Sequence, residues 1–199
     1  IYYWCPFLTH VATVDAVRNS IKSIKKFRKD KDKIIIINSC GEWDFNLNDK
    51  NDFDVIDLQK KNFHKNLPKT GFLKSRISFL IIFFLSFLKL LNLIKKNKPD
   101  FLIVHLLTIL PIILSPILSK YTKIILRISG YPKLHTFRKK TWTYFSKYLY
   151  KITTPTKLTL NLLAKNKIFP LEKMFVLRDP IIQCSEIIKK AKSKKDIFN

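Results

Sequence analysis

The stretch Lys33-Ile34-Ile35-Ile36-Ile37-Asn38 decides the fold class of this 199-residue chain. An unbroken run of β-branched residues is typical of a strand that is buried on both faces, as in a parallel sheet with helices on each side. Further strands are predicted at 1–7, 55–58, 101–106, 123–128, 152–153 and 174–177. All of them are expected to belong to one sheet.

Segments with apolar residues at helical spacing alternate with these strands. Helices are predicted at 13–27, 77–94, 109–119, 137–150 and 155–164. Pro116 is expected to kink or end the third of these helices, because proline lacks the backbone N–H that the helix needs. Strands that alternate with helices indicate βαβ units. The predicted fold is therefore α/β, a Rossmann-like, doubly wound parallel sheet.

The chain is strongly basic, with a formal net charge of +24, and 32 of its 38 basic residues are lysines. Nucleic acid and an anionic membrane surface are the two partners that such a charge suggests. Dedicated nucleic-acid readers rely on arginine, and the chain has no recognised reader motif, so a nucleic-acid partner is disfavoured. A composition rich in Lys, Ile, Asn and Phe also fits the codon bias of an AT-rich genome.

The segment 77–94 is the most apolar part of the sequence. A membrane span needs about 20 apolar residues, but the uninterrupted run here ends at Leu88. Two interpretations stay open: a core helix that covers the sheet, or a helix pressed into a membrane surface. Basic residues at both ends fit the second one; they are Lys74, Arg76, Lys95, Lys96 and Lys98.

A small integral membrane protein is a further alternative, with spans at 77–94 and 101–118. Pro99, Asp100, Pro111 and Pro116 argue against it. The three cysteines, Cys5, Cys40 and Cys184, have no CxxC spacing, which favours unpaired thiols in a reducing compartment. No cluster has the spacing of metal ligands.

Three motifs follow one another in the second half of the chain. The first is Lys98-Pro99-Asp100-Phe101-Leu102-Ile103-Val104-His105, and the second is Ile124-Ile125-Leu126-Arg127-Ile128-Ser129-Gly130. The third is Ile152-Thr153-Thr154-Pro155-Thr156, with Glu172-Lys173 and 174–180 after it. This ordered set, over residues 98–182, resembles the amino-terminal domain of glycosyltransferase family 4, of GT-B fold. Residues 1–60 fit that family by topology only.

The resemblance implies a retaining glycosyltransferase that takes a sugar from a nucleotide-sugar donor. The implied acceptor is a lipid-linked or surface-polysaccharide sugar, such as a lipopolysaccharide intermediate. The implied localisation is cytoplasmic, as a peripheral protein at the inner face of the cell membrane. The resemblance implies no metal and no cofactor besides the donor.

The same resemblance implies a division of the chain. Residues 1–182 would form the amino-terminal, acceptor-side domain, and 183–199 would lead into a carboxyl-terminal donor-binding domain. Because the chain starts at Ile1 and stops at Asn199, before that second domain, we expect a fragment that is inactive alone.

Ligands of open parallel sheets bind at the carboxyl ends of the strands, where the loops of these motifs lie. The family often has a histidine at the position of Ser129. A serine is no general base unaided, so Ser129 is expected to orient a ligand. His10 is the remaining candidate for a catalytic role, with a solvated or capping histidine as the alternative. The predicted substrate-binding residues are Thr9, His10, Arg127, Ser129, Gly130, Tyr131 and Thr156.

More specific expectations apply to Gly130, Thr156 and His105. Gly130 is expected to allow a positive φ and the close approach of a ligand. Thr156 is expected either to cap the helix that follows it or to orient a ligand oxygen. His105 is expected to be a core histidine whose hydrogen bonds are satisfied.

Overall fold

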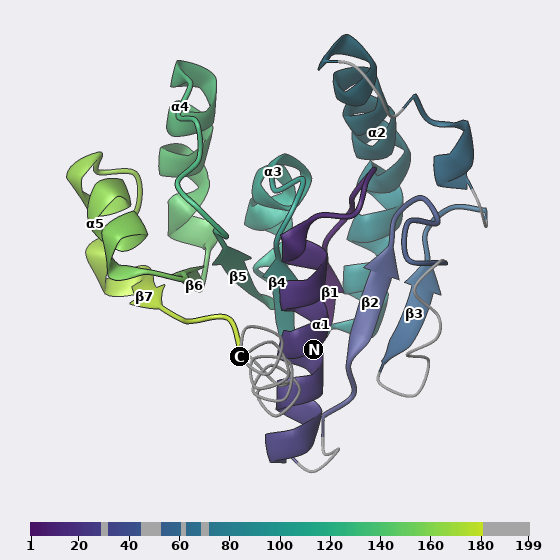
Figure 1. The fold of residues 1–199 in the computed structure, drawn as a ribbon, viewed down its shortest axis with the longest axis horizontal. Helices are drawn as coiled ribbons and strands as arrows, with labels where there is room; N and C mark the ends of the chain where they lie inside the picture. The colour runs from purple at the N-terminus through teal and green to yellow at the C-terminus, as the bar shows by residue number, and fades with distance from the viewer. Residues whose placement is uncertain (29–31, 45–52, 61–62, 69–71, 181–199) are drawn as a thin grey trace, which may run out of the picture.

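A computed structural model describes residues 1–28, 32–44, 53–60, 63–68 and 72–180 of the chain. Seven parallel strands form one sheet, in the order β3-β2-β1-β4-β5-β6-β7 (Figure 1). The strands are β1 (Tyr2–Trp4), β2 (Ile35–Asn38), β3 (Asp54–Asp57), β4 (Phe101–Val104), β5 (Lys123–Arg127), β6 (Lys151–Thr154) and β7 (Met174–Val176). The order reverses its direction between β1 and β4, which is the mark of a doubly wound Rossmann-like sheet. The predicted fold class is confirmed.

Five α-helices connect these strands. They are α1 (Ala12–Arg28), α2 (Phe72–Asn97), α3 (Ile109–Leu118), α4 (Thr136–Phe145) and α5 (Lys157–Lys165). Short 3-10 helices lie at η2 (Phe63–Asn66), η3 (Ser146–Tyr148) and η4 (Leu171–Lys173). The predicted connection 183–199 lies outside the described residues.

The side chains of β2 alternate between two hydrophobic cores, as the opening run predicts. Ile35 and Ile37 belong to the larger core, which also contains residues of α2, α3, α4 and α5. Ile34 and Ile36 belong to the smaller core, with α1 residues such as Ile21. The sheet therefore has α1 on one face and the other four helices on the opposite face.

The boundaries of several helices differ from the sequence-based expectation. Helix α2 is longer than 77–94 at both ends. Pro116 does not end α3, which continues to Leu118, because this proline lies in the last turn of the helix. The predicted helix 137–150 changes to the 3-10 helix η3 after Phe145. The predicted second span, 101–118, is not one helix, since it comprises the buried strand β4 and helix α3.

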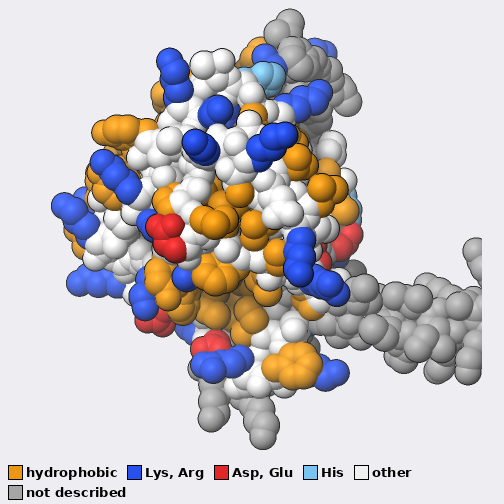
Figure 2. Space-filling view, turned by 90° about the vertical axis from the view of Figure 1, so that its left-hand side faces the viewer, with side chains coloured by type: hydrophobic (Ala, Val, Ile, Leu, Met, Phe, Trp, Pro, Cys, Tyr) orange, Lys and Arg blue, Asp and Glu red, His pale blue; other side chains and the backbone are white. Residues whose placement is uncertain are grey.

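The surface around α4, α5 and β7 mixes basic and apolar side chains (Figure 2). On this face the Lys and Arg residues surround a central apolar group instead of gathering in one groove. Exposed apolar residues of these elements include Leu158 and Phe175. The ammonium of Lys151 lies 4.0 Å from the centroid of the Phe175 ring, a cation–π contact.

Burial of β2 on both faces predicts a large cost for truncating it. Ile36 is fully buried, and it lies beside Tyr3 of β1 and Val55 of β3. Ile36→Ala is expected to lower the free energy of unfolding by about 3 kcal/mol, through lost transfer energy and a residual cavity. Urea denaturation followed by circular dichroism measures the change. Phe27→Ala, at a side chain that is 75% exposed, is the control and should change it by less than about 0.5 kcal/mol.

Candidate functional site

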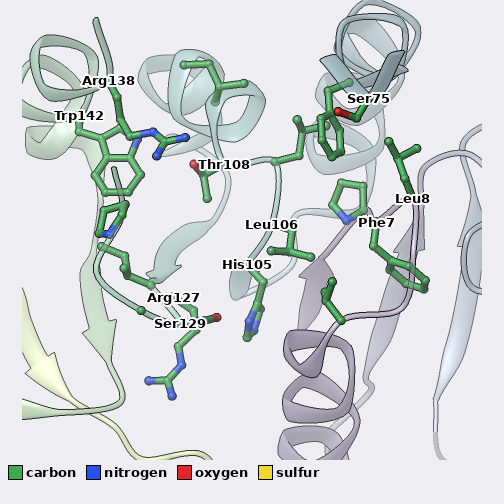
Figure 3. Close-up of a pocket in the computed structure, with 18 of the residues that line it drawn as sticks. Phe7, Leu8, Ser75, His105, Leu106, Thr108, Arg127, Ser129, Arg138 and Trp142 are labelled. Carbon is green, nitrogen blue, oxygen red and sulfur yellow. The ribbon is translucent and has the colours of Figure 1, made fainter. Parts of the chain in front are cut away.

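A cavity of about 690 Å³ opens at the carboxyl edge of the sheet, where the strand order reverses (Figure 3). Its walls come from the loops after β1, β4 and β5, from the first turns of α2 and from α4. A cavity of this size at this position is the usual ligand site of an open α/β sheet. The residues that line it include Thr9, Ser75, Phe79, His105, Thr108, Arg127, Ser129, Gly130, Arg138 and Trp142.

Hydrogen bonds between the β1 and β4 segments fix the loop at the centre of this cavity. The backbone N–H of His105 donates to the carbonyl of Trp4 at 2.9 Å. The indole Nε1 of Trp4 donates in turn to the carbonyl of Leu107 at 3.2 Å. Leu107 has a φ of 47°, an uncommon conformation for a residue other than glycine. The cavity wall is therefore held in place by its contacts with β1.

The polar side chains of the cavity are hydroxyl groups, two arginines and the imidazole of His105. Hydroxyls come from Thr9, Ser75, Thr108 and Ser129, and Asp and Glu are absent from the described lining. The guanidinium of Arg138 lies 5.8 Å from the Trp142 ring, which is itself only 4% exposed. This combination suits a sugar that carries a phosphate, since hydroxyls bond to hydroxyls and arginine binds phosphate.

Arg127 lies at the floor of the cavity, at the end of β5. Its side chain is only 5% exposed, which makes it a buried cation that needs partners. It donates to the carbonyl of Leu177, and its Nη2 lies 2.5 Å from a carboxylate oxygen of Asp179. Asp179 therefore compensates the buried charge and ties the segment after β7 to the centre of the sheet.

His105 lies beside Arg127, and its ring stacks on Tyr3 with centroids 6.0 Å apart. Burial, with a smaller effect of the Arg127 charge, lowers the pKa of His105 to about 3. The imidazole is therefore neutral at physiological pH and is a weak base. Neither ring nitrogen has a hydrogen-bond partner within the described chain, so the expectation of a satisfied core histidine is wrong.

A second cavity, of about 360 Å³, lies on the α1 side of the sheet. His105 and Arg127 line both cavities, and Thr153 lines the second one. The hydroxyl of Thr153 is also buried and without a partner among the described residues. These three side chains thus form a polar layer between the two cavities.

The structure brings together four of the seven predicted site residues: Thr9, Arg127, Ser129 and Gly130 line the larger cavity. Ser129 also links its loop to the start of α1, since its Oγ lies 3.5 Å from the hydroxyl of Thr13.

The other three predicted residues lie outside this cavity. The imidazole of His10 is half-exposed, and its Nε2 lies 3.3 Å from a carboxylate oxygen of Asp15. The hydroxyl of Tyr131 accepts a hydrogen bond from Asn166. The Oγ1 of Thr156 accepts from the backbone N–H of Thr159, which makes Thr156 the N-cap of α5.

Gly130 differs from expectation in its backbone, since among the described glycines only Gly41, with φ 88°, has a positive φ. A Cβ built on Gly130 meets no atom within 4 Å. The space directly beside the Cα of Gly130 is therefore open to a Cβ atom.

Sequence reasoning missed three features of the cavity: His105 as an unpaired polar group, Arg138 and Trp142. The one signal in the sequence was the position of His105, directly after a predicted strand. Arg138 and Trp142 are four residues apart on α4 and so share a helix face, but nothing in the sequence aims that face at the cavity.

The loop after β2 holds a buried polar cluster at the same sheet edge. The Asn38 side chain accepts from the backbone N–H groups of Gly41 and Trp43 at 3.1 Å each, and donates to Asp57 of β3 at 2.7 Å. Burial raises the pKa of Glu42, although the N–H groups of Ser39 and Cys40 bond to its carboxylate. Within the described ranges, no three His, Cys, Asp or Glu side chains gather in a way that could hold a metal.

Comparison of the structure with solved structures finds the same fold. A glycosyltransferase from Rickettsia africae ESF-5 superposes with a TM-score of 0.59 and 16% identity, over 98% of this chain and 48% of that one. UDP-N-acetylglucosamine 2-epimerase from Rickettsia bellii superposes with a TM-score of 0.57 and 14% identity, over 97% and 47%. No protein-family model and no curated protein matches the sequence.

The chain has a Rossmann-like fold of the GT-B type. It spans about half the length of the two solved proteins that it resembles. At these identities the likeness concerns the fold alone.

The buried, neutral His105 predicts a specific pH dependence of stability. Its folded pKa lies below its unfolded value, so the unfolded chain binds a proton as the pH falls below about 6.5 while the folded chain does not. Stability is therefore lost as the pH falls. Between pH 7 and pH 5 the free energy of unfolding of the wild type should fall by about 2 kcal/mol more than that of His105→Gln.

Urea denaturation of both proteins at both pH values measures this difference. The difference reports on His105, because the wild type and the variant share all other groups. The matched control is His135→Gln, at an exposed histidine, which should keep the wild-type dependence. Equal losses for the wild type and His105→Gln would contradict a neutral buried imidazole.

Proposed function

We propose that the chain is the acceptor-side part of a retaining glycosyltransferase that uses a nucleotide-sugar donor. The acceptor is a lipid-linked or surface-polysaccharide sugar, and it binds in the cavity between the loops after β1, β4 and β5. The observation that carries the proposal is this cavity, at the switch point of a sheet with the fold of about half of a glycosyltransferase. The resemblance of the motifs in 98–182 to glycosyltransferase family 4 supports the retaining reaction.

The lining of the cavity supports a sugar acceptor that carries a phosphate. The Trp142 ring belongs to the lining but is only 4% exposed, and the hydroxyls of Thr9, Thr108 and Ser129 can bond to the hydroxyl groups of a sugar. Arg138 lies beside that ring and can bind the phosphate. Because no Asp or Glu occurs in the described lining, an anionic acceptor meets no repulsion there.

Epimerisation of a nucleotide sugar is the second candidate, since the superposition on the epimerase is nearly as good. An epimerase acts on one molecule, whereas a transferase must also bind an acceptor. A cavity of about 690 Å³ within this part alone offers room for a separate acceptor, which favours transfer.

The cavity predicts that Gly130→Leu blocks sugar binding without a loss of stability. The new side chain enters open space, so the free energy of unfolding should change by less than about 0.5 kcal/mol. Isothermal titration with N-acetylglucosamine 1-phosphate should show at least about tenfold weaker binding than in the wild type. Leu158→Gln, at an exposed residue of α5, is the control and should bind like the wild type.

Two further measurements test the site and separate the two candidate functions. Tryptophan fluorescence should change on binding in the wild type and not in Trp142→Phe, because Trp142 is the tryptophan that lines the cavity. If Gly130→Leu binds N-acetylglucosamine 1-phosphate as tightly as the wild type does, this result contradicts an acceptor site in the cavity. Conversion of UDP-N-acetylglucosamine to its 2-epimer by this chain, without an acceptor, would favour the epimerase.

A further inference from the structure

The outward face of α2 carries a stripe of large apolar side chains. Ile77, Leu80, Phe84 and Leu88 follow one another at spacings of three and four residues, so they lie on one side of the helix. Each is at least half exposed, and Phe84 is 71% exposed. The stripe runs for about 16 Å along the helix axis, from the rise of 1.5 Å per residue.

The inward face of the same helix contains two small polar residues among large apolar ones such as Ile82 and Leu90. Ser78 and Ser86 are fully buried. The Ser78 hydroxyl lies 2.6 Å from the carbonyl of Pro68, whereas that of Ser86 has no partner among the described residues. The outward stripe includes Phe84, whereas Phe79, Phe83 and Phe87 pack against the hydrophobic cores.

Lysines lie at both ends of this stripe. Lys74 precedes it, and Lys95 and Lys96 end the helix, with Lys98 directly after it; all four are exposed. The sequence of α2 contains no Asp or Glu, and the chain as a whole carries a formal charge of +24. An apolar helix face between cationic ends complements the apolar and anionic layers of a phospholipid surface.

The first turns of α2 also form part of the candidate site. Ser75 lines the larger cavity (Figure 3), and so does Phe79. Ile77 and Leu80, on the same turns of the helix, are exposed. This end of α2 extends beyond the carboxyl ends of β1 and β2 (Figure 1). A surface that receives the stripe therefore also lies near the mouth of the cavity.

Helix α2 is the one described helix that is long and apolar enough to cross a membrane, with a mean hydropathy of 2.4 and 28% of its apolar window buried. Its second half, however, is part of the protein core, through Leu90, Leu91 and Ile94. The ammonium of Lys89 donates to the carbonyl of Leu58 at 2.7 Å. A spanning helix would lose these contacts, whereas a helix that lies flat on the surface keeps them.

We infer that α2 docks on an anionic phospholipid bilayer, with Ile77, Leu80, Phe84 and Leu88 in the headgroup region and the flanking lysines on lipid phosphates. The cavity then opens beside the bilayer, within reach of a lipid-anchored ligand. Docking itself depends only on the stripe and its charges, and not on the proposed function.

The test is flotation of the 199-residue chain with vesicles of equimolar phosphatidylcholine and phosphatidylglycerol. The wild type should bind these vesicles, and high salt or pure phosphatidylcholine should weaken the binding. The double variant Phe84→Asp/Leu88→Asp should lower the partition coefficient at least tenfold. The control Phe27→Asp/Leu158→Asp makes the same charge change at equally exposed apolar residues of α1 and α5, and should lower it less than twofold.

Three results would overturn the inference: no binding of the wild type at low salt, equal losses in both double variants, or a wild-type dimer that Phe84→Asp/Leu88→Asp makes monomeric. The last result would assign the stripe to a second copy of the chain. The assay contains no sugar or nucleotide, so its failure leaves the acceptor site untouched.

A label at Leu80 gives a second measurement that needs no change in the charge of the stripe. Cys5 and Cys40 are buried, and burial raises the pKa of the Cys5 thiol to about 12, so neither should react with a maleimide in the folded chain. A fluorophore on Leu80→Cys, in a Cys184→Ser background, should be quenched by spin-labelled lipid. The same fluorophore on Leu158→Cys should not be quenched, and equal quenching at both sites would contradict docking through α2.

Discussion

Parallel pairing between β1 and β4 is the constraint on which the rest of the molecule depends. Residues Tyr2–Trp4 align with Leu102–Val104, one hundred positions further along the chain. The connections from these two strands leave in opposite directions, so their loops diverge and leave a crevice above the sheet. The Trp4 indole then bonds to the carbonyl of Leu107 and holds the β4 loop at the edge of that crevice. The cavity follows from this one strand pair.

The fold could be predicted because its evidence is local. Ile34–Ile37 is apolar at every position, and the structure uses alternate positions of that run for two different cores. The cap at Thr156 is also a local signal, a hydroxyl directly before a helix. The cavity is different, because His105, Arg138 and Trp142 come together only through the order of the strands. No spacing in the sequence encodes that order, so these residues could not be assigned to a site.

The orientation of α2 could not be predicted either, since apolar residues occur around most of its circumference. Ile82 and Phe84 are only two positions apart and equally apolar, yet the first is 1% exposed and the second 71%. Ser78 and Ser86 are fully buried at positions four residues before and after Ile82, so they share its inward side. A pattern based on hydropathy alone would have placed these serines on the outside.

Arg127 borders both cavities, but its countercharge Asp179 belongs to the segment after β7 and not to the sheet. Strand pairing positions the backbone of Arg127, whereas Asp179 meets the guanidinium from outside the sheet. Without this carboxylate the guanidinium would be an uncompensated buried charge. The charge balance at the cavity floor is therefore shared between two segments that lie 52 residues apart in the chain.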